Sequence, residues 1–183
     1  MELIKAKEVA EQVMRRLSPY SDRLEIAGSI RRGKAEVSDI DLVVIPKTLP
    51  IIDMFGQVID RRSMIDRKLL EGLGIVIKAG KRFAQVELWE GINLELSMIL
   101  PPATWPVMMV IKTGPADFSH WIVTSRNKGG ALPNGWRNED GRVWDGQTEM
   151  KFEEELDFLK FLGLGWIEPK DRRPRWNYFR RPN

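Results

Sequence analysis

The sequence contains no cysteine and a single histidine, His120. It therefore has no disulfide bonds, no thiolate metal ligands and no thiol nucleophile, and one histidine cannot build a zinc site with cysteine partners. No apolar run approaches the roughly 20 residues of a membrane-spanning helix. Residues 1–17 are charged and lack the uninterrupted apolar core of a signal peptide. We expect a soluble, intracellular, cytoplasmic protein that makes no contact with a membrane.

The chain does contain enough apolar material for a core, since 43% of its 183 residues are hydrophobic. This length fits one compact body with a small appended subdomain. Prolines at 101, 102 and 106 indicate a boundary, so we expect domains over residues 1–105 and 106–183.

The net charge is +3, and a basic C-terminal cluster fits a nucleic-acid partner. This cluster comprises Arg172, Arg173, Arg175, Arg180 and Arg181.

One short stretch combines two features that suit phosphate chemistry. Residues 28–33 are Gly-Ser-Ile-Arg-Arg-Gly, and Asp39-Ile-Asp41 then opens the apolar run 42–45. Side chains alternate along a strand, so Asp39 and Asp41 leave the same face about 7 Å apart and can share hard cations. The Gly-Ser turn offers N–H groups and a hydroxyl to phosphate oxygens, and the two arginines offer cationic forks. Together these features predict the transfer of a nucleotidyl group.

Periodicity predicts the order of the remaining elements. A helix over residues 1–17 ends near Ser18-Pro19, and residues 52–70 form one or two helices. In the strand that follows the Glu90-Gly91 turn, Asn93, Glu95 and Ser97 alternate with apolar residues and form a polar face that can point at the aspartates. The expected strands cover residues 24–27, 40–45, 75–78, 83–89 and 92–99.

Three ordered motifs resemble the X-family DNA polymerases, the DNA polymerase beta group. The first is the Gly-Ser-x-Arg-Arg-Gly segment with its Asp-x-Asp. The second is Thr-Gly-Pro-Ala-Asp-Phe-Ser at 113–119, and the third combines 152–156 with Leu-Gly-Leu-Gly-Trp-Ile-Glu-Pro at 162–169. The resemblance implies an α+β fold: a nucleotidyltransferase palm with a mixed or antiparallel sheet and helices, plus a small C-terminal α+β subdomain that selects the nucleotide. The amino-terminal lyase and helix-hairpin-helix subdomains of the family are not expected here, as in its reduced viral members.

The resemblance also implies roles for individual residues. Asp39 and Asp41 hold two Mg2+ ions, for which Mn2+ can substitute, and Glu95 completes the metal site. Arg32 is favoured over Arg31 as the phosphate ligand, while Arg31 pairs with the palm. The residues expected to bind the nucleotide are Gly28, Ser29, Arg32, Ser38, Thr113, Gly114 and Phe118. Those expected to bind DNA are Arg126, Lys128, Arg172, Arg173 and Arg175.

Some positions depart from the family pattern. The third palm carboxylate is usually an aspartate, and here the strand offers Asn93 or Glu95, of which only Glu95 is charged. Phe118 is equally well explained as a core aromatic. The usual Tyr-Phe pair before Thr-Gly is Ile111-Lys112, so we expect weak discrimination between dNTP and rNTP.

The leading hypothesis is a monomeric, template-directed DNA polymerase that fills short gaps and takes primer-template or gapped DNA with dNTP or rNTP. One alternative is a template-independent nucleotidyltransferase that acts on nucleic acid or another acceptor. A second is a degenerate domain that only binds nucleic acid or a protein. The segment 113–118 favours the polymerase, and the intact Asp39 and Asp41 argue against the degenerate domain.

Overall fold

A computed structural model describes residues 1–100 and 104–175 of the chain. The chain divides into two compact units, one of Met1–Ile26 with Ala35–Leu100 and one of Ala27–Lys34 with Pro101–Asn183. The division after Leu100 lies close to the expected boundary at 105/106. No sequence pattern indicated that Ala27–Lys34, which carries the Gly-Ser motif, groups with the second unit.

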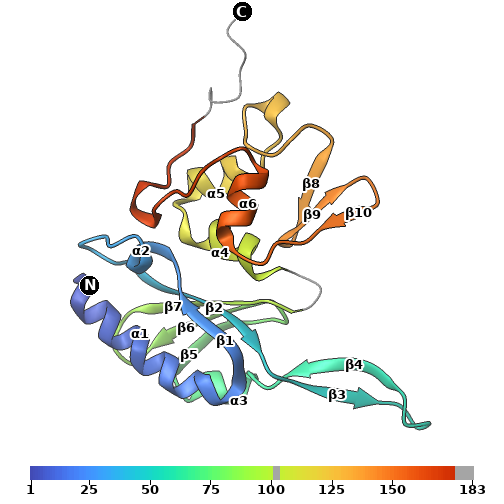
Figure 1. Cartoon of the computed structure of the whole chain (residues 1–183). Coiled ribbons are helices and arrows are strands. Elements are labelled where there is room, and N and C mark those ends of the chain that lie inside the picture. The colour runs from blue at the N-terminus through green and yellow to red at the C-terminus, as the bar shows by residue number, and fades with distance from the viewer. Residues whose placement is uncertain (101–103, 176–183) are drawn as a thin grey trace, which may run out of the picture. The chain divides into compact units, whose positions relative to one another are not determined.

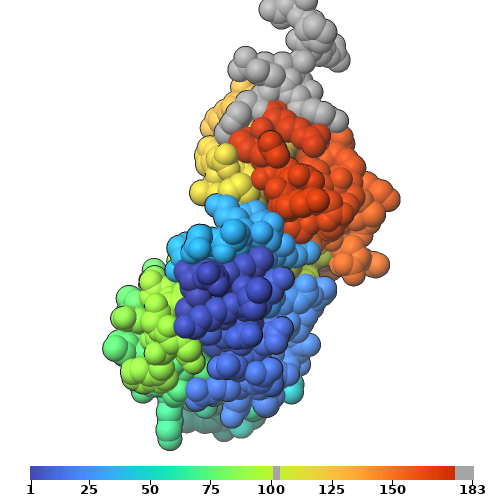
Figure 2. Space-filling model, turned by 90° about the vertical axis from the view of Figure 1, so that its left-hand side faces the viewer, coloured from blue at the N-terminus to red at the C-terminus, as the bar shows by residue number. Residues whose placement is uncertain are grey.

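The first unit is built on a five-stranded mixed sheet with the strand order β1-β2-β7-β6-β5. Strands β2 and β7 are parallel, and the other neighbours are antiparallel. Figure 1 shows α1 along one face of this sheet, and the outer side of α1 lies on the molecular surface (dark blue, Figure 2). This arrangement confirms the α+β class and the mixed sheet. The elements are α1 (Leu3–Leu17), η1 (Ser18–Tyr20), β1 (Ser21–Ile26), β2 (Asp39–Pro46), β5 (Gly74–Ala79), β6 (Phe83–Leu88) and β7 (Asn93–Met98).

Helix α1 is amphipathic, and this explains how it packs. Ala6, Val9, Val13 and Leu17 recur at helical spacing and are all buried, whereas its charged residues face solvent. The helix ends where Pro19 enters the 3-10 turn η1, because a proline disfavours helix in the residue before it. The predicted helix and its end are therefore confirmed.

The prediction of helices over residues 52–70 is wrong for most of that range. The chain forms an antiparallel ribbon of β3 (Thr48–Ile52) and β4 (Val58–Ser63), and only α3 (Arg67–Glu71) is helical. At the tip, the Asp53 carboxylate accepts hydrogen bonds from the N–H groups of Phe55 and Gln57. Gly56 takes a left-handed conformation with φ of 80°. A turn of this kind with β-branched residues on both sides favours a hairpin over a helix.

The second unit packs helices and a three-stranded antiparallel sheet, with the order β10-β9-β8, around its own core. Phe118, Trp121 and Phe158 are its largest fully buried side chains. Among the helices in the described parts of the chain, none is long and apolar enough to cross a membrane. The elements are α2 (Gly28–Arg31), α4 (Trp105–Thr113), α5 (Ala116–Val123), η2 (Arg126–Lys128), β8 (Trp136–Glu139), β9 (Arg142–Asp145), β10 (Thr148–Met150), α6 (Glu155–Phe161) and η3 (Pro169–Asp171).

Candidate functional site

Two neighbouring strands of the first unit carry carboxylates on one face of the sheet. In the parallel register of β2 and β7, Asp41 lies opposite Glu95 and Asp39 lies opposite Asn93. The residues between them, which include Ile40 and Leu94, are fully buried. Because side chains alternate along a strand, the three carboxylates and Asn93 share the other face, where all four are half-buried.

Glu95 and Asn93 are the two candidates for the third metal ligand, and they differ in charge. Glu95 has Asp41 on one side and Gln85 of β6 on the other. Asn93 lies between Asp39 and Glu87 in the same way. Both candidates are therefore neighbours of an aspartate, but only Glu95 adds negative charge to the pair.

The chemistry of this donor set fits a hard divalent cation, because carboxylate oxygens are the ligands that Mg2+ prefers. Within residues 1–100 and 104–175, no three His, Asp or Glu side chains are gathered as a ready metal site. Ion binding therefore requires these side chains to rotate, or oxygen ligands from a bound phosphate, as is usual for Mg2+. Ser38, directly before Asp39, is exposed.

The Gly-Ser motif, expected as a turn, forms one turn of helix in the second unit, α2. Gly28 has a φ of 53°, a conformation that glycine adopts without strain. Ser29 is only 7% exposed, and its Oγ has no hydrogen-bond partner in the part of the chain that the structure describes. A buried hydroxyl without a partner is costly, so this oxygen is poised for a ligand or a water molecule.

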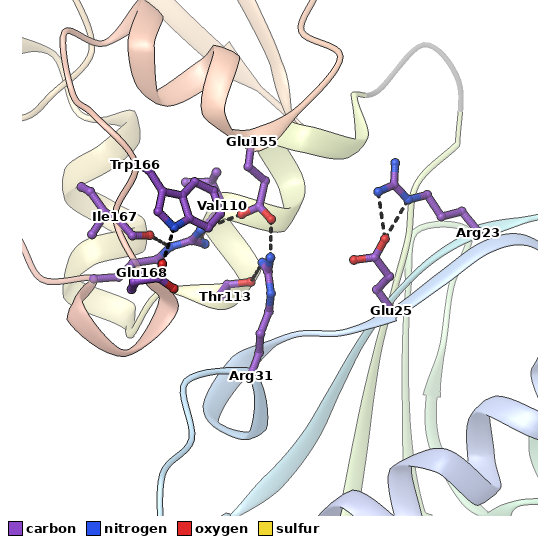
Figure 3. Close-up of polar contacts among 10 residues, drawn as sticks. Arg23, Glu25, Arg31, Val110, Thr113, Glu155, Trp166, Ile167 and Glu168 are labelled. Carbon is purple, nitrogen blue, oxygen red and sulfur yellow. Dashed lines mark hydrogen bonds and ion pairs between the residues drawn. The ribbon is translucent and has the colours of Figure 1, made fainter.

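Two consecutive arginines attach this turn to the end of α4. Arg31 Nη1 donates to Thr113 Oγ1 at 2.7 Å, and Arg32 Nη1 donates to the Thr113 carbonyl oxygen at 2.7 Å. The side chain of Arg31 also contacts Glu155 at 2.5 Å (Figure 3). Arg31 was expected to pair with the palm, and the structure instead places its partners in the second unit. Arg31 therefore positions the segment that carries Ser29 and Arg32.

Glu155 connects Arg31 to a second arginine, Arg172. Arg172 Nη2 donates to the other Glu155 carboxylate oxygen at 2.7 Å. Burial raises the pKa of Glu155, but the hydrogen bond from Arg31 and the charge of Arg172 outweigh it and hold this pKa below its ordinary value. Burial lowers the pKa of Arg172. The assignment of Arg172 to DNA binding is wrong, because its side chain is fully buried in this network.

Three residues of the 113–119 motif also have structural roles. Thr113 is fully buried, and both its hydroxyl and its carbonyl oxygen accept hydrogen bonds from arginines. Phe118 is fully buried in the core of the second unit, so the expected contact with a base is corrected to a core position. An added Cβ on Gly114 would lie 2.3 Å from the Phe118 ring. Packing against Phe118 is thus a sufficient reason for glycine at position 114.

The remaining residues expected to bind DNA differ in their exposure. Arg126 donates to the carbonyl oxygens of Ala131 and Leu162 and holds its own loop in place. Lys128, Arg173 and Arg175 are exposed. Arg180 and Arg181 lie outside the described residues.

Sequence reasoning missed Glu155, the centre of the arginine network. Its only signal was its place in the acidic segment 152–156, in which three consecutive glutamates are equally charged. The partners of Glu155 are 124 and 17 residues away along the chain, so no local pattern selects it from its neighbours.

Comparison with known proteins gives a structural likeness only. No family model and no curated protein matches the sequence. Two solved structures of Leishmania infantum polymerase beta, titled a ternary P/T complex and a ternary gap complex, match 95% of this chain at 13% identity with TM-scores of 0.65 and 0.66. The match covers 77% and 71% of those chains. The protein therefore has a fold like that of polymerase beta.

Proposed function

We propose that this protein is a DNA polymerase that adds nucleotides to a primer 3′-OH. The observation that carries the proposal is the placement of Asp39, Asp41 and Glu95 on one half-buried face of a polymerase beta-like sheet. Carboxylate oxygens at adjoining positions of one sheet face are the kind of ligand that a hard divalent cation binds. A site of this kind is suited to metal-assisted phosphoryl transfer.

In this proposal Asp39, Asp41 and Glu95 hold two Mg2+ ions, which Mn2+ can replace. When bound, the ions lower the pKa of the primer hydroxyl and neutralise charge on the phosphates. The hydroxyl oxygen bonds to the α-phosphorus, the bond to the pyrophosphate oxygen breaks, and the hydroxyl proton passes to Glu95 or to water. The three carboxylates orient the reacting groups, and positioning supplies much of the acceleration.

Ser29 and Arg32 are proposed to bind the phosphates of the incoming nucleotide. The Ser29 hydroxyl has no other partner among the described residues, and a guanidinium suits the oxygens of a leaving pyrophosphate. The hydrogen bonds of Arg31 and Arg32 to Thr113 hold the backbone of this segment in place. Gly28, at the start of α2, and Ser38, directly before Asp39, are also proposed to contact the nucleotide. Lys128, Arg173 and Arg175 are exposed cations suited to DNA phosphates.

The test is primer extension on gapped, nicked and single-stranded DNA of matched sequence, with each dNTP and rNTP offered separately in Mg2+ or Mn2+. Incorporation that follows the template supports the polymerase. Incorporation that ignores the template base would indicate a template-independent nucleotidyltransferase. No incorporation under any condition, with DNA binding intact, would indicate a domain that only binds DNA. Comparable use of dCTP and CTP opposite guanine is expected, because Ile111-Lys112 lacks an aromatic side chain to exclude the 2′-OH.

A further inference from the structure

The β3–β4 arm, residues 48–63, is a two-stranded ribbon that extends away from the five-stranded sheet of the first unit (teal, Figure 1). Its tip is strongly apolar and open to solvent, with Met54 89% and Phe55 79% exposed. The adjoining Ile52, Val58 and Ile59 are exposed as well. Contiguous exposed apolar side chains on a projecting element indicate a surface that is covered by a partner.

The charges of the arm indicate the kind of partner. Arg61 and Arg62 are consecutive in β4, so they leave opposite faces of the ribbon, and both are exposed. Asp53 accepts hydrogen bonds in the turn, and Asp60 is paired with Lys81 at 3.2 Å. Both acidic side chains of the arm are thus engaged by the protein itself. The arm therefore presents one cation on each face to a partner that is negative on both sides.

The spacing along the arm fits a groove of B-form DNA. A strand advances about 3.3 Å per residue, so Arg61 lies about 10 Å behind Val58, where β4 leaves the tip. The major groove is about 8.5 Å deep and about 12 Å wide, and it admits a two-stranded ribbon. Met54 and Phe55 lie farther out than Val58, so with the tip at the groove floor Arg61 and Arg62 lie just outside the groove, and their long side chains extend toward the two phosphate backbones at its rim.

We propose that the β3–β4 arm inserts into the major groove of duplex DNA. Met54 and Phe55 contact base edges and thymine methyl groups, and Arg61 and Arg62 each contact a phosphate of one strand. This inference rests on the proposed function in its choice of DNA as the partner, and it adds an anchor on the duplex that the carboxylate site does not require.

The test is a fluorescence anisotropy titration of the whole protein with a labelled 20-base-pair DNA duplex at several KCl concentrations. R61Q/R62Q is expected to weaken binding at least fivefold and to reduce the salt slope by about 1.8, because two phosphate contacts are lost. M54S/F55S is expected to weaken binding to a similar degree without changing the salt slope. All four positions are exposed, so the melting temperature is expected to stay unchanged.

Matched controls separate the arm from general surface effects. R15Q/R16Q removes two consecutive exposed arginines of α1, and I75S/I77S removes two exposed apolar side chains of β5. Both controls are expected to bind duplex DNA within twofold of wild type. Arm variants that bind like the controls would overturn the proposal, and a docking surface for a protein would then account for the arm.

Two further measurements locate the contact and keep it distinct from the proposed function. The arm variants are expected to match wild type on an RNA duplex, because the A-form major groove is too narrow for the ribbon, and an equal loss there would overturn the groove assignment. Nucleotide incorporation at saturating gapped DNA is measured in the same samples. A wild type that binds through the arm but never incorporates nucleotide refutes the proposed function alone. A wild type that incorporates but binds duplex DNA independently of the arm refutes this inference alone.

Discussion

Asp41 of β2 and Glu95 of β7 are directly paired across the parallel register of the first unit's sheet. Neither strand alone brings three carboxylates together, since Asp39 and Asp41 come from one and Glu95 from the other. The pairing depends on a crossover of about fifty residues between β2 and β7, which includes the β3–β4 arm and two further strands of the sheet. Any register shift by one residue between these strands would move Glu95 to the buried face.

Replacement of Asp39 by alanine is expected to abolish nucleotide incorporation and leave the fold intact. The substitution removes a proposed metal ligand and also relieves repulsion among carboxylates, so the melting temperature should hold or rise. Single-nucleotide insertion and thermal unfolding measure the two effects. Asp22→Ala, which removes an exposed carboxylate on β1, is the control. Activity within a few-fold of wild type in Asp39→Ala would contradict the metal assignment, and Asp41→Ala is expected to lose activity in the same way.

Glu95→Gln is expected to lose far more activity than Asn93→Ala. Glutamine keeps the size of Glu95 but removes its charge, and charge is what distinguishes Glu95 from Asn93 at these two paired positions. The measurement is the rate of single-nucleotide insertion at saturating DNA and nucleotide. If Asn93→Ala loses activity and Glu95→Gln keeps it, Asn93 and not Glu95 is the third metal ligand.

Arg32→Ala is expected to raise the KM for nucleotide about tenfold, the equivalent of about 1.4 kcal/mol, with little change in DNA affinity. The variant also loses the hydrogen bond to the Thr113 carbonyl oxygen, so its melting temperature must be measured beside its kinetics. The exposed neighbour Lys34 provides the control variant Lys34→Ala. Equal losses of nucleotide and DNA affinity would indicate a general electrostatic role for Arg32.

Glu155→Gln is expected to destabilise the second unit by about 3 kcal/mol, because it leaves Arg31 and the buried Arg172 close together without the carboxylate that pairs with both. Six of the seven tryptophans lie after residue 100, so urea unfolding followed by tryptophan fluorescence reports mainly on this unit. Glu139→Gln, whose partner Arg137 is exposed, should change little. A Glu155→Gln variant as stable as this control would show that the arginine network contributes nothing to stability.

Glu155 also makes the stability of the second unit depend on pH. The folded-state pKa of Glu155 lies below its ordinary value of 4.5, so the unfolded chain binds a proton more readily than the folded chain does. The contribution of Glu155 is therefore complete above pH 4.5 and is lost as the pH falls through the folded-state pKa. Unfolding curves from pH 7 to pH 3 should show wild type losing stability faster than Glu155→Gln. Parallel curves for the two proteins would contradict the lowered pKa.

Local patterns were enough to predict the five strands of the first unit's sheet. Alternation of polar and apolar residues located Glu95 on the face of Asp39 and Asp41, because burial of one face of a strand fixes the direction of every side chain. The same reasoning failed for residues 52–70, where basic residues at helical spacing concealed the turn that Asp53 and Gly56 form. An exposed ribbon has no buried face, so its sequence carries no clean period of two.

In the second unit, tertiary contacts give two residues roles that differ from those suggested by their sequence motifs. Arg172 belongs to a basic cluster in the sequence, yet its side chain is buried and paired with Glu155. Phe118 stands in a motif expected to face the nucleotide, yet the apolar core of the unit encloses it. Charge and aromaticity are visible in a sequence, but burial depends on partners far along the chain, and a motif alone does not specify them.

Gly114→Ala provides the sharpest test of the packing within the 113–119 motif. The added methyl group would lie 2.3 Å from Cδ1 of Phe118, a fully buried ring that cannot move into solvent. Overpacking of this kind costs about 1–3 kcal/mol, and the φ of −67° at Gly114 rules out a backbone cause because alanine adopts it readily. Gly165→Ala is the control, since no atom lies within 4 Å of its added methyl group. Urea unfolding should show a loss of stability in Gly114→Ala alone. If Gly114→Ala keeps its stability but the KM for nucleotide rises, close approach of substrate to the backbone, and not Phe118, is the reason for glycine at this position.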